Sequence, residues 1–301
     1  MHELPKGSDV KHIGMRRARA LSNLSPKKQL DIIAEGLPIL MESAGGLFDA
    51  ANELSDHPRS AAVLRGQALE EVAKILILVD LVRCPTSQRS SRVGAMTKWF
   101  YDHLARLLYV EAQSWKPMHL RQLQEYVDGQ RGLHYLEGEF GEYIIPNYEI
   151  YRRESDLYAD VFEEEDGTLH WNDPQSTYHD PVDSNALVVS LSNPASWRVC
   201  KALRYFGAFS RQGLEIVSTT WSKIDFKDVE SYADTRTLTF EMMQGLEKAN
   251  LIADEAKEGQ LGALYNAWQL PMYRVNFSAI KVSLQELQDE RDRSLAYYQS
   301  Y

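Results

Sequence analysis

The chain has 301 residues and a formal net charge of -10, with 44% hydrophobic and 25% charged residues, a composition typical of one large or two ordinary globular domains. The first thirty residues hold no apolar signal-peptide core, and no stretch approaches eighteen uncharged apolar residues, so we expect neither secretion nor membrane spanning. The predicted location is the cytoplasm, where the two distant cysteines, Cys84 and Cys200, are expected to be buried thiols without a metal-ligand role.

The negative charge is concentrated in one segment. Residues 137–183 contain fourteen Asp and Glu against only Arg152 and Arg153, a net charge of -12 that leaves +2 for the rest of the chain. Residues 1–25 form a basic leader with three arginines between positions 16 and 19. A basic surface for a nucleic acid therefore remains available, and the alternative is an ordinary solvated face.

The first two predicted helices form a hairpin. Apolar residues recur at helical spacing over about 25–55, and Pro38 is expected to kink or divide this helix because proline removes a backbone hydrogen bond. After a turn at 56–58, the run over 61–82 is apolar on nearly every side of a helix. The short connection predicts that the two helices pack antiparallel.

Polar residues interrupt this apolar second helix at one place. Glu70, Glu71 and Lys74 lie in the stretch ALEEVAK, on a helix face that becomes apolar farther along. A buried charge is costly unless it is paired, so each of the three needs a partner. Glu70 and Lys74 are four residues apart and can pair directly. The alternative to a functional site is therefore an internal ion pair that only closes the helix's own polar patch.

The third predicted helix carries a histidine among cations. Proline and serines predict a loop over 84–92, and a helix follows over 93–114. His103 lies in the middle of the apolar face, with Arg106 one turn later and Lys98 just over one turn earlier. Two cations beside an imidazole suit the binding of an anion such as phosphate. The alternative is a histidine that is simply satisfied within the core.

The remaining pattern completes an all-α prediction. The elements expected after residue 115 are a helix over 118–143, an irregular acidic insertion outside the bundle over 146–185 with a hairpin around Asp166-Gly167, a long helix from Pro194 to Trp221, and helices over 235–253 and 279–298. The predicted organisation is the leader 1–25, a helical domain 26–225 and a C-terminal helical extension 226–301.

Common cofactor motifs are absent from the sequence. The patterns GxGxxG, GxxxxGK, HExxH, GxSxG and CxxC do not occur. No histidine has a glutamate three residues before it, which also excludes the di-iron helical bundle. We therefore expect no cofactor and no metal.

Three stretches together resemble the AbiV-type abortive-infection proteins of the HEPN superfamily. AAVLRGQALEEVAKILIL is similar to the family's alanine-rich second helix, and WFYDHLAR is similar to its histidine-containing helix. YRRESDLYADVFEEEDG, with Pro174 after it, is similar to a basic-then-Leu-Tyr segment that the family places before its last bundle helix. The stretches cover roughly residues 36 to 225, and their order and spacing carry the resemblance.

The resemblance implies an HEPN-like antiparallel bundle, commonly dimeric, in a bacterial anti-phage system that arrests growth of the infected cell. Many HEPN proteins are metal-independent RNases whose signature is an arginine, four to six residues and then a histidine. None of the eight histidines here has an arginine at that spacing, and Lys98 fills the slot before His103. Lysine supplies charge but not the two-pronged geometry of arginine, so the departure bears on catalysis more than on fold.

The leading hypothesis is an RNA endonuclease toxin. Its expected catalytic residues are His103 as general base or acid, Arg106 on the scissile phosphate and Glu70 as the group that orients them. The residues expected to bind substrate or complete the network are Lys98, Lys74 and Glu71. The rival hypothesis is a catalytically silent helical protein that binds a phage or host protein, which the missing arginine spacing and the acidity favour.

A homodimer is also expected. The chain holds more large apolar groups than one thin bundle is expected to cover, namely Trp99, Trp197, Tyr205, Phe206 and Phe209. The alternative is that the C-terminal helices cover these side chains within one chain.

Overall fold

The computed structural model describes residues 20–163, 168–172, 193–227, 231–256 and 258–299, and these are mostly helical. In chain order the elements are α2 (Pro26–Glu53), α3 (Pro58–Arg83), α4 (Thr86–Tyr101), α5 (His103–Ser114), α6 (Leu120–Asp128), β1 (His134–Glu137), β2 (Tyr143–Pro146), α7 (Tyr148–Leu157), β3 (Asp160–Glu163), β4 (Leu169–Asn172), α9 (Ala195–Tyr205), α10 (Arg211–Trp221), α11 (Tyr232–Lys248), α12 (Glu258–Ala267) and α13 (Leu284–Gln299). The all-α expectation is confirmed at this level, with the addition of two small antiparallel sheets.

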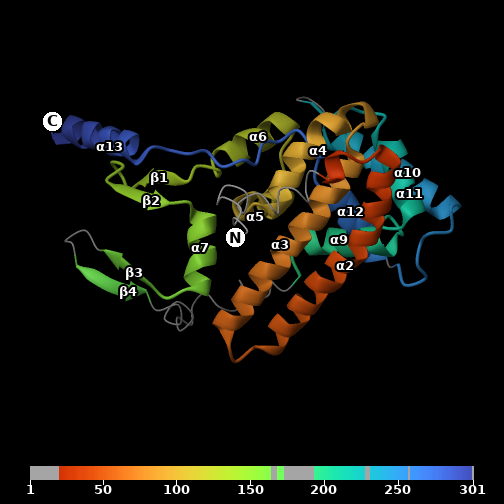
Figure 1. The fold of residues 1–301 in the computed structure, drawn as a ribbon, viewed down its shortest axis with the longest axis horizontal. Coiled ribbons are helices and arrows are strands. Elements are labelled where there is room, and N and C mark those ends of the chain that lie inside the picture. Colours follow the sequence, from red (N-terminus) through yellow and green to blue (C-terminus); the bar gives the residue numbers. More distant parts are fainter. Residues whose placement is uncertain (1–19, 164–167, 173–192, 228–230, 257, 300–301) are drawn as a thin grey trace, which may run out of the picture.

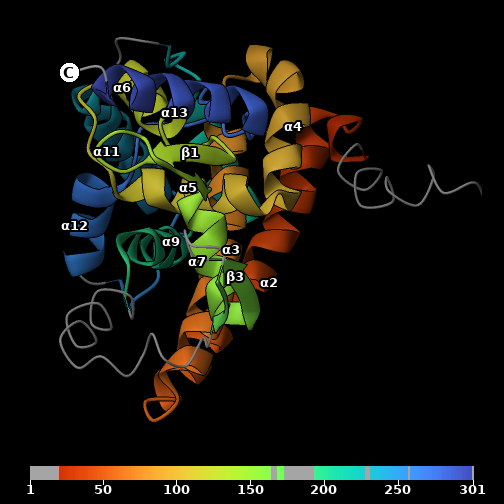
Figure 2. The same cartoon turned by 90° about the vertical axis from the view of Figure 1, so that its left-hand side faces the viewer.

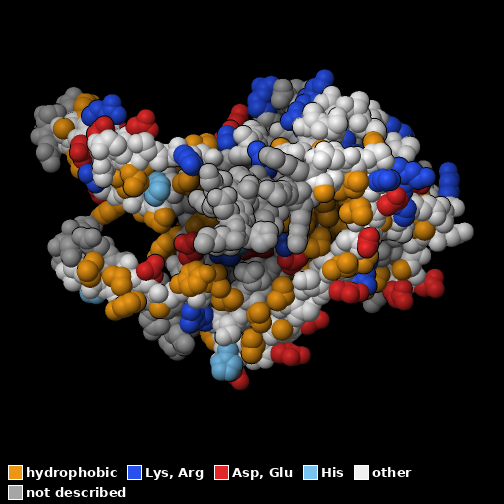
Figure 3. Space-filling view, viewed as in Figure 1, with side chains coloured by type: hydrophobic (Ala, Val, Ile, Leu, Met, Phe, Trp, Pro, Cys, Tyr) orange, Lys and Arg blue, Asp and Glu red, His pale blue; other side chains and the backbone are white. Residues whose placement is uncertain are grey.

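The molecule consists of a helical body and an arm. In Figure 1 the body contains α2–α6 and α9–α12, and the arm, formed by α7, the hairpins β1–β2 and β3–β4, and α13, extends to the left. Hydrophobic side chains lie on the surface of the arm (Figure 3), and Tyr151, Tyr158 and Trp171 are among those that are more than half exposed. No helix in the described ranges combines the length and the apolar character that a bilayer crossing demands.

The predicted helical hairpin is confirmed as α2 and α3. The side chain of Ser25 accepts a hydrogen bond from the Lys28 amide and caps α2, which satisfies one of the free N–H groups of the first turn. Pro38 lies inside α2 without dividing it. Buried apolar residues at helical spacing turn one face of α2 toward α3, whose second half is almost entirely buried. Helix α3 is the central element, because α2, α4, α5, α7, α9 and α10 all pack against it.

The expected loop over 84–92 and the single helix over 93–114 were wrong. Helix α4 begins at Thr86, and the chain leaves helical geometry at Asp102, with φ -93° and ψ 125°. The Asp102 side chain accepts the Ala105 amide at 2.9 Å, so it caps a new helix, α5. His103 is consequently the first residue of α5 and not the middle of a longer helix.

The expected helix over 118–143 was also wrong beyond its first third. Helix α6 ends at Asp128, and β1 then pairs antiparallel with β2. Gly138 and Gly141, which have φ of 102° and 67°, form the turn between the strands. Glycine adopts positive φ without a steric penalty, and this is why the glycine-rich stretch folds as a hairpin.

The acidic insertion was expected to lie outside the bundle, but one of its helices packs against the body. Helix α7 packs against both α3 and α5, a placement on which Figures 1 and 2 agree. The hairpin predicted within the insertion is confirmed by the pairing of β3 with β4, whereas its turn at Asp166-Gly167 and the segment over 173–185 lie outside the described residues.

The predicted long helix after Pro194 is two helices, α9 and α10. Gly207, at φ 74°, reverses the chain between them. Helix α12 was not predicted, and the chain after it carries Trp268, Tyr273 and Phe277 into the same core as α3 and α5. The part of the predicted extension up to residue 277 therefore shares the core of the main bundle, whereas α13 lies on the arm.

A buried polar network that was not predicted fixes this C-terminal segment. Arg83 is 1% exposed and pairs with Asp80 at 2.7 Å, and its guanidinium carbon lies 3.8 and 4.1 Å from the ring centroids of Trp221 and Trp268. Asp80 accepts hydrogen bonds from the Tyr109 hydroxyl and the Met272 amide. Removal from water raises the pKa of Asp80, while the charge of Arg83 opposes that shift.

The large aromatic residues that motivated the dimer are covered within one chain. Trp99, Trp197, Phe206 and Phe209 are all buried; Trp99 packs on Phe277, and Trp197 packs on Phe48. The alternative of coverage in cis is confirmed for these four residues, so the homodimer stays a prediction without this support. Both cysteines are buried free thiols, as expected, and burial raises the pKa of Cys84 to about 12.

Candidate functional site

Glu70 is the centre of a cluster of charged side chains from three helices. Its side chain, on α3, is 2% exposed. Oε2 lies 2.8 Å from Nδ1 of His103 and 2.8 Å from Nη2 of Arg106, both on α5, and Oε1 lies 2.8 Å from Nε of Arg153 on α7. We refer to Glu70, His103, Arg106 and Arg153 as the Glu70 cluster.

The break at Asp102 places the two α5 residues. Since α5 begins at His103, its first turn presents His103 and Arg106 on one face at a spacing of three residues. Nε of Arg106 also donates to the Asp102 carbonyl oxygen at 3.3 Å, which ties the guanidinium to the start of the helix. The structure therefore brings together the three residues that the sequence nominated as catalytic, and their role stays a prediction.

Nδ1 of His103 has two possible hydrogen-bond partners in the cluster. Nδ1 of His103, Nη2 of Arg106 and Oε2 of Glu70 form a nearly equilateral triangle with sides of 2.9, 2.8 and 2.8 Å. An ionised carboxylate only accepts hydrogen bonds, so the contact with Oε2 is a hydrogen bond when Nδ1 carries a proton, whereas an unprotonated Nδ1 can accept from Nη2 of Arg106. In the tautomer with the proton on Nδ1, Nε2 is the nitrogen that can act as a base, and the side chain as a whole is 50% exposed.

The cluster has a surplus of positive charge. One carboxylate, Glu70, faces the two guanidinium groups of Arg106 and Arg153, whose side chains are 9% and 19% exposed. A partly buried positive charge without its own counter-ion favours the approach of an anion, most strongly a phosphate that can accept paired N–H donors.

The other predicted residues do not join the cluster. Lys74 pairs with Glu71 at 2.5 Å and not with Glu70, whose two oxygens are already occupied. These two side chains are 17% and 19% exposed, and Nζ of Lys74 lies 5.6 Å from the centroid of the Phe100 ring. The expected network of Glu70, Glu71 and Lys74 is therefore two separate sets of contacts.

Lys98 lies apart because it belongs to α4. Its side chain is exposed, and no ion pair within the described part of the chain joins it to Glu70. The break at Asp102 removes the common helix that would have brought Lys98 onto the face of His103. If Lys98 serves the site, it does so from the edge.

Arg153 is the cluster member that the sequence analysis missed. Arg152 and Arg153 are the two cations of the acidic segment, and an amphipathic helix turns only one of two adjacent residues inward. Arg152 is 51% exposed and pairs with Glu149 at 3.0 Å, whereas Arg153 points to Glu70. The signal was therefore the adjacent pair of arginines, but recognising it required the position of α7.

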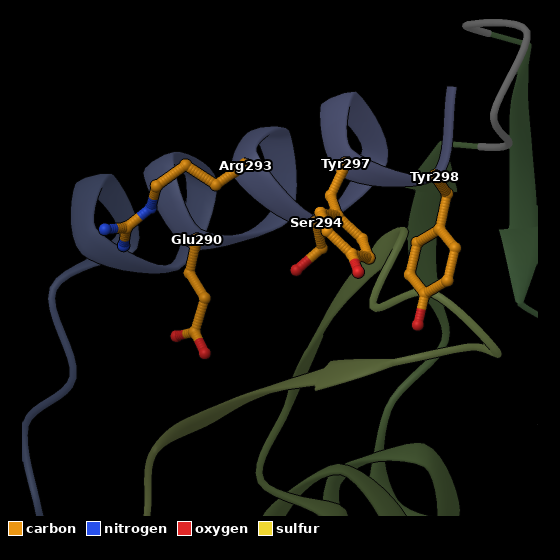
Figure 4. A pocket seen from close by; sticks show the side chains of 5 residues that line it. All are labelled: Glu290, Arg293, Ser294, Tyr297 and Tyr298. Carbon is orange, nitrogen blue, oxygen red and sulfur yellow. The ribbon is translucent and has the colours of Figure 1, made fainter. Parts of the chain in front are cut away.

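Among the described residues, neither a metal-binding group nor a pocket on α13 adds to the Glu70 cluster. No group of three or more His, Cys, Asp or Glu able to hold a metal occurs among the residues that the structure describes. A pocket on α13 is lined by Glu290, Arg293, Ser294, Tyr297 and Tyr298 (Figure 4) and contains no residue of the Glu70 cluster. All five side chains come from one helix at the end of the arm, and they form no arrangement suited to chemistry.

The chain was compared with known proteins. It matches no protein-family model, no curated protein and no solved structure. The resemblance to the AbiV-type HEPN proteins therefore rests on the sequence motifs alone.

Proposed function

We propose that this protein is a metal-independent RNA endonuclease toxin of a bacterial abortive-infection system. The observation that carries the proposal is the Glu70 cluster, in which a carboxylate orients a half-exposed histidine beside two arginines. Cleavage of RNA by its own 2'-hydroxyl uses a base, a group that orients the base, and a cationic site for the phosphate. The Glu70 cluster offers all three in direct contact with one another.

The proposed reaction begins at Nε2 of His103. This nitrogen accepts the proton of a ribose 2'-hydroxyl, and the 2'-oxygen forms a bond to the adjacent phosphorus. The bond from phosphorus to the 5'-oxygen breaks, and that oxygen leaves with a proton from water. Glu70 stabilises the imidazolium that forms, because its carboxylate accepts the hydrogen bond from Nδ1.

Arg106 supplies electrostatic stabilisation in this proposal. Its guanidinium lies beside the imidazole and is largely removed from water, where its field on a developing negative charge is strong. In comparable sites one such donor contributes roughly 3 kcal/mol to transition-state stabilisation. Arg106 therefore takes the role that the HEPN signature gives to an arginine before the histidine, from the opposite side of His103.

A second candidate function is a catalytically silent protein that binds a phage or host protein. One observation favours it, namely that both oxygens of Glu70 are satisfied by side chains from two other helices, so the cluster also fixes the fold. In that case the aromatic surface of the arm is the natural region for a protein partner.

Induced expression in a bacterial host separates the two candidates. We expect wild type to arrest growth and fragment RNA, and His103→Ala to do neither. His57→Ala is the matched control, because His57 is exposed, lies at the N-cap position of α3 and makes no contact with the Glu70 cluster among the hydrogen bonds and ion pairs of the described residues. Growth arrest by His103→Ala equal to that by wild type, with intact RNA in both, would contradict the nuclease proposal and favour the binding protein.

A further inference from the structure

We propose that Arg153 is a positioning residue of the Glu70 cluster, and that the docking of α7 completes the site. The inference deepens the proposed function and rests on it for its effect on RNA cleavage. Its structural part concerns the orientation of Glu70 and His103, and it is testable whether or not the protein cuts RNA.

The two oxygens of Glu70 have different duties. Oε2 receives His103 and Arg106, and Oε1 receives Arg153 alone. The last torsion of a glutamate side chain has a broad energy profile, so a carboxylate bound at one oxygen can rotate about that contact. The bond of 2.8 Å from Nε of Arg153 removes this freedom and keeps Oε2 directed at Nδ1 of His103.

Polar contacts and the partly buried side chains of Ile150 and Leu157 hold α7 in place. No side chain of α7 is fully buried, and Ile150 packs only partly buried against the core. At the C-terminal end, Arg59 of α3 donates to the carbonyl oxygens of Asp156 and Leu157 at 2.9 and 3.1 Å. The position of α7 therefore depends on a few hydrogen bonds, and the bond from Arg153 to Glu70 is the one that connects α7 to the Glu70 cluster.

The N-terminal end of α7 is fixed in the same manner. The side-chain oxygen of Asn147, a residue that is 2% exposed, accepts the amides of Glu149 and Ile150 and so caps the helix. Its side-chain nitrogen donates to the carbonyl oxygens of Gln130 and Gly132. These contacts set the axial position of α7, so that Arg153, one and a half turns later, meets Glu70.

The consequence for His103 is a preference between its two neutral tautomers. While Glu70 is held, Oε2 accepts from Nδ1 and the proton stays on that nitrogen. Without Arg153 the carboxylate can turn away, and Nδ1 of His103 can instead accept from Arg106. The proton then moves to Nε2, and the ring loses its base at the nitrogen that faces solvent.

The test compares Arg153→Gln with Arg152→Gln, a substitution at the adjacent residue that does not touch Glu70. Nitrogen-15 NMR of the ring nitrogens of the neutral His103 gives the tautomer directly. We expect the Nδ1–H form to dominate in wild type and in Arg152→Gln, and the Nε2–H form to gain in Arg153→Gln. Arg153→Lys, which restores the charge and one donor, should recover part of the wild-type spectrum and keeps the test decisive if Arg153→Gln does not fold.

Cleavage provides the second readout. In the nuclease proposal, Arg153→Gln should lower kcat about tenfold or more with little change in KM, because the base is misplaced while substrate contacts remain. A tautomer shift without any cleavage by wild type would support the role of Arg153 and reject the proposed function. A His103 tautomer and a cleavage rate that are the same in Arg153→Gln and Arg152→Gln, or an Nε2–H ring in wild type, would overturn the inference.

Discussion

At the scale of single residues, we expect Glu70 to contribute to the stability of the fold and His103 to contribute mainly to the proposed reaction. Glu70→Ala should lower the free energy of unfolding by roughly 3 kcal/mol, because it leaves Arg106 and Arg153 without their carboxylate in a largely buried place. His103→Ala should cost well under about 1 kcal/mol, since its side chain is half exposed and its removal strands no charge. Urea unfolding of both variants measures the difference, and equal losses would contradict this account of the cluster.

Sequence reasoning nominated Glu70, His103 and Arg106, and it failed for Arg153, for a physical reason. Helical spacing places His103 and Arg106 on one face, and the cost of an unpaired buried carboxylate called for partners to Glu70. Arg153 is 83 positions from Glu70 in sequence, and periodicity carries no information about such a distant contact. The pairing of Glu71 with Lys74 depended on which neighbour already occupied Glu70, which is also a tertiary property.

At the scale of elements, the long periodic helices were predictable and the breaks were not. Helices α2 and α3 follow from continuous apolar periodicity. The break at Asp102 depends on one side chain capping α5, and the β1–β2 hairpin depends on two glycines at positive φ. Apolar spacing alone does not distinguish these local choices from a continued helix, because the same residues are buried in either case.

A substitution at Gly207 tests whether the turn between α9 and α10 needs a residue with positive φ. An alanine at φ 74° is strained, and its methyl group would overlap the backbone carbonyl of Leu251. Gly207→Ala should therefore lower the free energy of unfolding by at least about 2 kcal/mol. Gly36→Ala in α2 is the opposite case: an added methyl group meets nothing within 4 Å, so the variant should be more stable by about 0.5 kcal/mol. Thermal unfolding curves in which both variants match wild type would refute the expectation.

The loop after α10 is held to the C-terminal segment by an ion pair that responds to pH. Arg274 forms a bidentate contact with Asp225, in which Nη2 donates to Oδ2 at 2.6 Å and Nε donates to Oδ1 at 3.1 Å. Partial burial raises the pKa of Asp225, but the hydrogen bonds and charge of Arg274 outweigh it and hold this pKa below its ordinary value. A lowered carboxyl pKa stabilises the fold above the unfolded value, near pH 4, and this contribution is lost as pH falls through the folded value.

The corresponding variant is Asp225→Asn. Its free energy of unfolding should lie about 1 kcal/mol below that of wild type at pH 7, and the gap should shrink steadily below about pH 4. The measurement is denaturant unfolding of both proteins between pH 7 and pH 3. A gap that is constant over this range would show that Asp225 acts through its shape and not its charge.

At the scale of the whole molecule, the segment over residues 268–277 belongs to the core of the helical body. The buried Arg83 and its contacts with Asp80, Trp221 and Trp268 join α3, α10 and the chain after α12. A division at residue 226 was predicted because the stretches that resemble the HEPN proteins end near residue 225. The structure differs because a buried segment without regular secondary structure, over residues 268–277, fills the core.

The homodimer is a prediction for the assembled protein. The aromatic surface that first suggested it is buried, so the remaining candidate surface is the arm, where Tyr151, Tyr158 and Trp171 are exposed. We expect light scattering at micromolar concentration to give about twice the chain mass of 34.5 kDa. A particle of 34.5 kDa would refute the dimer.

The most direct test of the central claim is cleavage of single-stranded RNA by the purified protein in EDTA. The Glu70 cluster predicts that wild type and His57→Ala cut the RNA and leave a 2',3'-cyclic phosphate, while His103→Ala is slower by about a hundredfold or more and remains folded. Intact RNA with wild type, or equal cleavage by wild type and His103→Ala, would contradict the nuclease account.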